Sequence, residues 1–215
     1  MKTAARNIIL FFSILYSSAA YTQTAWIDSV KKVLPAQKED TNKVSTLISL
    51  SWAYRFSYPD SGLVYAQKAL SLAEKLNSEE STFWSLVSIN QTLYILGNYA
   101  LELDYAFKEF SLAKKINTPF TIAVSKGQLT DCYRNLGEYN TALKYWREVV
   151  KITEQSYPDE RPKVYGNSSR IFEDMHQYDS ALIYAKRSYE LFEHNPLLNK
   201  ENDDSKFIKS AYLPL

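Results

Sequence analysis

Residues 129–150 read LTDCYRNLGEYNTALKYWREVV and contain the pattern that predicts the fold most clearly. Its second half carries large apolar side chains at Leu143, Trp146 and Val150, spaced three and four residues apart. That spacing places them on one face of an α-helix. Gly137 lies between this pattern and the helical pattern before it, and glycine suits the left-handed residue that closes a helix. The stretch therefore predicts two helices joined by a tight turn.

The same pattern recurs along the chain. A leucine followed two residues later by a tyrosine occurs at intervals of 40, 40 and 39 residues, beginning at Leu63, Leu103, Leu143 and Leu182. A fixed period of this length is typical of proteins built from stacked structural repeats. We therefore expect four helix pairs, at about 41–78, 80–117, 119–157 and 161–195.

The amino-acid composition is consistent with a helical protein and argues against several kinds of partner and binding site. Only 5 glycines and 7 prolines are present, too few for a fold of many short strands and turns. The 25 Lys and Arg residues nearly balance the 24 Asp and Glu residues, which argues against a nucleic-acid partner. With one cysteine and two histidines, neither a disulfide framework nor a metal site is expected, and no cofactor is predicted.

The N-terminus has the layout of a secretory signal peptide. Lys2 and Arg6 precede an apolar run at 8–16, which is followed by small residues that end at Ala20. The run is about half the length needed to span a bilayer, so we predict a signal peptide at 1–20 that is cleaved. No cysteine near the cut offers a site for a lipid anchor. The expected location is periplasmic or secreted, with no segment that crosses the membrane after cleavage.

Segments at both ends flank the repeats. Residues 21–40 carry apolar residues at helical spacing and are expected to form a capping helix or a linker. Residues 199–215 contain a polar run followed by apolar Phe207, Ile208 and Tyr212. They are expected to form either a capping helix or a truncated fifth repeat, and the second alternative would allow self-association through an exposed apolar end.

The repeat resembles that of tetratricopeptide repeat proteins, with units of about 40 residues in place of the commonest 34. The third copy matches the family pattern at Leu129, Thr130, Tyr133, Gly137, Tyr139 and Ala142. The resemblance implies an all-α domain at 41–198, a right-handed α-solenoid of four helix pairs. A more specific resemblance involves residues 39–43 together with Leu50, Ser51 and Trp52. These residues are similar to the extracytoplasmic sensor region of signalling proteins from Bacteroidetes-type bacteria.

In the family, one face of the first helix of every repeat lines a concave wall that binds peptides or proteins. Carried onto this sequence, the wall positions fall on Arg55, Trp84, Gln91, Tyr94, Asp131, Arg134, Asn135, Lys163, Arg170 and Glu173. The resemblance implies that the cationic and amide side chains hold peptide oxygens and that the aromatic ones supply apolar contacts.

No catalytic arrangement is recognisable around His176, His194 or Cys132, so we expect a non-catalytic scaffold that binds a protein or peptide outside the cytoplasm. The alternative is the ligand-sensing portion of a two-component-type system that works with a separate membrane kinase or regulator.

The second copy departs from the family pattern. Glu102 and Glu109 stand where small residues let helices approach closely, and their separation of seven residues places them on one helix face. Carboxylates are rarely packed inside proteins without partners. The pair indicates either a looser contact between repeats or a partner that carries cations.

Overall fold

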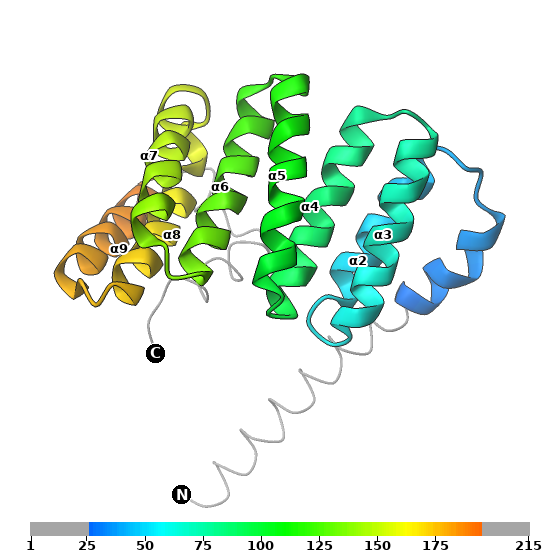
Figure 1. Cartoon of the computed structure of the whole chain (residues 1–215), viewed down its shortest axis with the longest axis horizontal. Coiled ribbons are helices and arrows are strands. Elements are labelled where there is room, and N and C mark those ends of the chain that lie inside the picture. The colour runs from blue at the N-terminus through cyan, green and yellow to red at the C-terminus, as the bar shows by residue number, and fades with distance from the viewer. Residues whose placement is uncertain (1–25, 195–215) are drawn as a thin grey trace, which may run out of the picture. The chain divides into compact units, whose positions relative to one another are not determined.

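The computed structural model describes residues 26–194. The predicted signal peptide and the segment 199–215 lie outside the described residues. Residues 26–33 are helical, within the segment predicted to be a capping helix or a linker, and the short 3-10 helix η1 (Leu34–Ala36) follows them. Every regular element of the described part of the chain is a helix (Figure 1). The expected all-α repeat fold is confirmed.

The chain divides into two compact units, and the first is Met1–Gly97. Its main helices are α2 (Thr41–Tyr54), α3 (Pro59–Lys75) and α4 (Glu79–Ile95), each in contact with the other two. Val44, Leu47 and Ile48 of α2 meet Ala69 and Leu72 of α3 in a common apolar core. The three-residue and four-residue spacing of these side chains explains why one face of each helix is buried.

The second unit is Asn98–Leu215, in which each main helix contacts the next along the chain. The main helices are α5 (Tyr99–Ile116), α6 (Pro119–Asn135), α7 (Tyr139–Ser156), α8 (Arg161–Asp174) and α9 (Tyr178–Glu193). The 3-10 helix η2 (Pro158–Glu160) joins α7 to α8. Leu143 and Trp146 of α7 pack with Tyr165 and Ile171 of α8, as the repeated apolar positions predict.

Local capping explains where the helices begin. The side chains of Asp40, Ser78, Asn98 and Thr118 accept hydrogen bonds from backbone N–H groups in the first turns of α2, α4, α5 and α6. These groups have no acceptor within the helix, so a polar side chain just before the first turn stabilises it. Prolines begin α3 and α6, at a position where the missing N–H costs nothing.

The turn predicted at Gly137 is present. Gly137 has φ +78° between α6 and α7, and its N–H donates to the carbonyl of Arg134. His176 occupies the equivalent turn between α8 and α9 with φ +58°, a conformation that residues other than glycine adopt less readily. The two turns make α6 and α7, and then α8 and α9, antiparallel neighbours, so that α6 and α8 are the first helices of their repeats.

Candidate functional site

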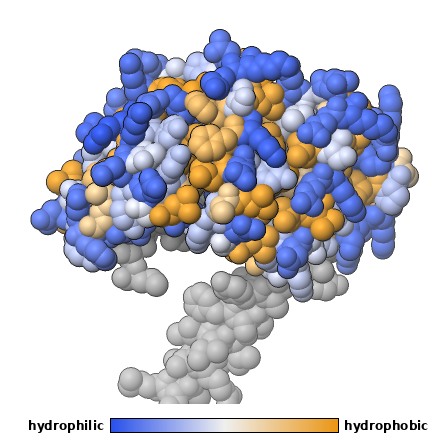
Figure 2. Space-filling model, viewed as in Figure 1, coloured by the Kyte–Doolittle hydropathy of each residue, from blue (hydrophilic) through white to orange (hydrophobic). Residues whose placement is uncertain are grey.

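The residues predicted to line a binding surface fall in both units. Arg55 ends α2, and Trp84, Gln91 and Tyr94 belong to α4 of the first unit. In the second unit, Asp131, Arg134 and Asn135 belong to α6, while Lys163, Arg170 and Glu173 belong to α8. In the space-filling view, hydrophilic side chains cover most of the visible surface, with apolar side chains scattered between them (Figure 2).

In the first unit, the structure brings Arg55 and Gln91 together. Nη1 of Arg55 donates a hydrogen bond to Oε1 of Gln91, which ties the end of α2 to α4. The guanidinium also lies 4.6 Å from the centre of the exposed Phe56 ring. Its Nε–H is buried without a hydrogen-bond acceptor among the described residues, and burial lowers the pKa of Arg55. The Nε–H of Arg55 is therefore available to donate a hydrogen bond to a ligand or to another part of the protein.

The two predicted aromatic residues of α4 have different surroundings. Trp84 is half-buried, packs against the core of the first unit and meets the Phe83 ring edge-on. Tyr94 is exposed. A side chain already held by the core has less surface for a ligand, so Tyr94 is the more accessible of the two. The assignment of both residues to a binding surface stays a prediction.

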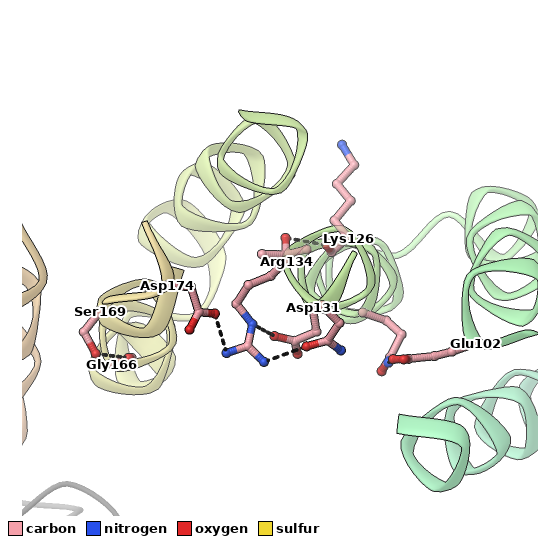
Figure 3. Close-up of polar contacts among 10 residues, drawn as sticks. Glu102, Lys126, Asp131, Arg134, Gly166, Ser169 and Asp174 are labelled. Atoms are coloured by element: carbon pink, nitrogen blue, oxygen red, sulfur yellow. Dashed lines mark hydrogen bonds and ion pairs between the residues drawn. The ribbon is translucent and has the colours of Figure 1, made fainter. Parts of the chain in front are cut away.

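Arg134 is the centre of a polar cluster in the second unit. Its side chain is only 9% exposed and lies between α6 and α8 (Figure 3). Nη1 is 3.6 Å from Oδ2 of Asp174 at the end of α8, and Nε is 3.9 Å from Oδ1 of Asp131. Nη2 donates to Oδ1 of Asn135 at 3.2 Å. One guanidinium therefore orders three polar side chains and links the first helices of two successive repeats.

This cluster changes the expected role of Arg134. Two carboxylates already balance its charge, so it is poorly placed to capture a further anion by itself. Lys163 and Arg170 on α8 are exposed and remain accessible. Partial burial raises the pKa of Asp131, while the nearby charges of Arg134 and Arg170 oppose that rise. Arg170 therefore belongs to the same electrostatic environment as the α6 cluster.

Asp174 is the member of this cluster that is absent from the predicted wall positions. It lies 39 residues after Asn135, which is the repeat interval between the third and fourth copies. The repeat register of the wall position Asn135 therefore points to Asp174. Lys126 of α6 pairs with Glu148 of α7, so charged contacts link α6 to α7 as well as to α8.

Glu102 and Glu109 are fully buried in the second unit. Nε2 of Gln128 on α6 donates to Oε1 of Glu102 at 2.9 Å. Burial raises the pKa of Glu102 from 4.5 to about 7, although hydrogen bonds from Cys132 and Gln128 favour the charged form. A neutral amide from the adjacent helix is thus one hydrogen-bond partner of Glu102. Neither glutamate is accessible on the surface for a partner that carries cations.

The other residues that could take part in catalysis or metal binding are Cys132 and the histidines. Cys132 is fully buried, and burial together with the nearby Glu102 raises the pKa of its thiol, which disfavours the reactive thiolate. His176 is exposed at a turn, with Nδ1 3.1 Å from the hydroxyl of Tyr178. Between residues 26 and 194, no group of three or more His, Cys, Asp or Glu side chains is placed to hold a metal ion. Within the same range, no helix has the length and apolar character needed to span a membrane.

A shallow surface hollow of about 280 Å³ lies elsewhere in the second unit. It is formed by the turn between α5 and α6 together with the end of α7, and its lining includes Ile122, Ile152 and Gln155. No charged side chain lines it. It lies apart from the Arg134 cluster in the chain and shares no residue with it.

Comparison with known proteins identifies the fold. No protein-family model and no curated protein sequence matches the chain. Among solved structures, it is similar to a Rap protein complexed with Competence and Sporulation Factor, at 18% identity and a TM-score of 0.70. The match covers 82% of this chain and 51% of the Rap protein. The fold is a tetratricopeptide-type helical repeat.

Two further structures show the same likeness. Aspartyl phosphate phosphatase F from Bacillus subtilis is 16% identical, with a TM-score of 0.66, and the match covers 86% of this chain and 48% of the phosphatase. A signal transduction ATPase with a tetratricopeptide repeat sensor from Pyrococcus horikoshii is 21% identical, with a TM-score of 0.64. That match covers 77% of this chain and 26% of the ATPase. The chain thus spans about half or less of the length of these three proteins, and at such identities the likeness establishes the fold alone.

Proposed function

We propose that this protein is a non-catalytic repeat scaffold that binds an extended segment of another protein or a peptide, and that it does so outside the cytoplasm. The observation that carries the proposal is the ordered polar surface on α6 and α8. There Arg134 fixes Asp131, Asn135 and Asp174, while Arg170 remains exposed nearby.

The chemistry of this surface suits a peptide main chain. An extended peptide presents both N–H donors and carbonyl acceptors along its length. The side chains of Asp131 and Asp174 are each 45% exposed and offer acceptors, while Lys163 and Arg170 offer charged donors. Because ion pairs and a hydrogen bond within the cluster already hold part of the surface, less conformational entropy is lost on binding.

Two similar proteins support this class of function. One is a Rap protein whose structure contains Competence and Sporulation Factor, and another carries a tetratricopeptide repeat sensor. The extracytoplasmic location rests on the signal peptide predicted at residues 1–20.

The second candidate function is the ligand-sensing portion of a signalling system with a separate membrane kinase or regulator. The resemblance at 39–43 and the repeat sensor of the similar signalling ATPase favour it. A kinase or regulator gene next to this one, together with copurification of the two proteins, would support the sensor. A scaffold alone requires neither.

A direct test uses a library of random linear peptides selected on the full protein. The affinity of a selected peptide is then compared in wild type, Arg170→Glu and Lys163→Glu. We expect each charge reversal to weaken binding about tenfold or more, equivalent to about 1.4 kcal/mol, because an exposed donor becomes a repulsive carboxylate. Lys144→Glu, at an exposed position on α7, is the matched control and should leave the affinity unchanged. If Lys144→Glu lost as much affinity as the α8 variants, this surface would be refuted as the binding site. The same conclusion would follow if Arg170→Glu and Lys163→Glu both kept the wild-type affinity.

A further inference from the structure

Asn135 connects the Arg134 cluster to a buried carboxyl group. Its Oδ1 accepts a hydrogen bond from Nη2 of Arg134. Its Nδ2 is buried without a well-formed hydrogen bond among the described residues, and so is Oε2 of Glu102. Burial raises the pKa of Glu102, and an interaction with the Asn135 amide is among the contacts that oppose this rise. A donor and an acceptor that both lack a partner therefore lie at the same contact between α5 and α6.

The face of α6 that meets Glu102 is polar over its last two turns. Gln128, Cys132 and Asn135 are spaced four and three residues apart, so they share this face. All three lie within reach of the Glu102 carboxyl group, and Nε2 of Gln128 already occupies its Oε1. Figure 3 shows Glu102 and Asp174 approaching α6 from opposite sides. Asn135 is the member of this face that also contacts the Arg134 cluster.

The charge of Glu102 decides whether Asn135 is held. A carboxylate accepts at both oxygens, so Oε2 can accept from Nδ2 of Asn135 while Oε1 binds Gln128. This contact keeps the amide oxygen turned toward Arg134. A proton on Oε2 makes that oxygen a donor, which cannot hold the N–H of Asn135. An amide that turned to accept the proton would withdraw its oxygen from Arg134.

We propose that Glu102 is a positioning residue for the binding surface of α6 and α8, because its charged form holds Asn135 and, through Asn135, the guanidinium of Arg134. Peptide binding at this surface is then linked to release of a proton from Glu102, and the affinity increases with pH. The link to binding rests on the proposed function, whereas the positioning of Arg134 by Glu102 does not.

Other ionisable groups at this contact determine which variant is informative. Oδ1 of Asp131 lies 3.9 Å from Nε of Arg134, and partial burial raises the pKa of Asp131. Burial also raises the pKa of the Cys132 thiol, which therefore stays protonated at neutral pH. Glu109, two turns after Glu102 on α5, is fully buried and is among the groups that raise the pKa of Cys132. An effect that belongs to Glu102 must disappear when Glu102 alone is replaced.

Nuclear magnetic resonance of side chains tests the positioning without a peptide. When the full chain is titrated from pH 5 to pH 8.5, the Asn135 amide signals and the Arg134 Nε–H signal should shift together, with a midpoint at about pH 7. Both shifts should disappear in Glu102→Gln. Glu190→Gln, at an exposed position on α9, is the control and should keep the wild-type titration. Equal shifts in wild type and Glu102→Gln would assign the titration to Asp131 and overturn the proposal.

Peptide affinity tests the link to binding. The probe is a peptide selected on the full protein that has blocked termini and no histidine, so its own charge is nearly constant between pH 5.5 and pH 8. We expect wild type to bind it about fivefold more tightly at pH 8 than at pH 5.5, and Glu102→Gln to bind equally at both. Asn135→Leu, which keeps the side-chain size and removes the amide, should also lose the difference.

Two results of the affinity measurement would overturn the proposal. One is an equal affinity of wild type at both pH values, and the other is a fivefold change that persists in Asn135→Leu. Failure to select any peptide would count against the proposed function alone, because the titration of Asn135 and Arg134 needs no peptide and still decides whether Glu102 positions them.

Discussion

Replacement of Trp146 with alanine is expected to lower the free energy of unfolding by about 3–5 kcal/mol. The Trp146 ring is 5.1 Å from the Tyr184 ring, centre to centre, and 6.5 Å from the Phe172 ring. Its Nε1–H donates to the carbonyl of Val164 at 3.2 Å. Alanine would leave a cavity between α7, α8 and α9, which are held together by this cluster. Urea denaturation followed by circular dichroism measures the loss.

Two matched variants separate packing from the hydrogen bond. Trp146→Phe keeps much of the aromatic contact and loses the indole donor, so it should cost about 1–3 kcal/mol for the unsatisfied carbonyl and the reduced volume. Trp52→Ala removes a tryptophan that is exposed on α2 and should change stability by about 0.5 kcal/mol or less. A loss below about 1 kcal/mol in Trp146→Ala would contradict the described contact between α7 and α8.

The second large effect is expected at Glu102. Its carboxyl group has an ordinary pKa of 4.5, raised to about 7 in the folded protein, so between these values the folded state binds more protons than the unfolded state. The stabilising contribution of protonated Glu102 is fully present below pH 4.5 and is lost as the pH rises through 7. The contribution lost is on the order of 3 kcal/mol.

Glu102→Gln should remove this pH dependence, because the neutral amide does not titrate and can still meet Gln128. Urea unfolding at pH 5 and pH 8 should show wild type losing stability at pH 8 relative to the variant. At pH 4, where wild-type Glu102 is protonated in both states, the two should be similar. Glu190→Gln on the exposed side of α9 is the control and should follow wild type. Parallel stability profiles for wild type and Glu102→Gln would show that Glu102 is not held in its protonated form.

The helices were predictable because their signals are local. Pro119 begins α6 and Gly137 closes the turn after it, and the spacing from Leu143 to Val150 defines the buried stripe of α7. Each signal depends on residues within one or two turns of the chain. Hydrophobic periodicity and the residues that begin and end helices are therefore sufficient to predict an all-α fold.

The surroundings of individual side chains were less predictable. Phe83 and Trp84 are adjacent aromatic residues, and periodicity alone does not show that Phe83 is fully buried while Trp84 is half-buried against the same unit. The pairing of Arg134 with Asp174 depends on the distance between two helices, although the repeat register points to Asp174. The repeat pattern indicates that position 102 lies at a helix contact. The protonation of Glu102 depends also on its burial and on its hydrogen bond from Gln128 of α6, which the pattern does not show.

Hydrogen–deuterium exchange with and without a saturating selected peptide tests most directly whether the first-helix surface binds. Slower exchange in α6 (Pro119–Asn135) and α8 (Arg161–Asp174) is the predicted result, because the peptide would contact the face that holds Arg134 and Arg170. Protection confined to the second helices α7 and α9, with α6 and α8 unchanged, would contradict the proposed binding surface.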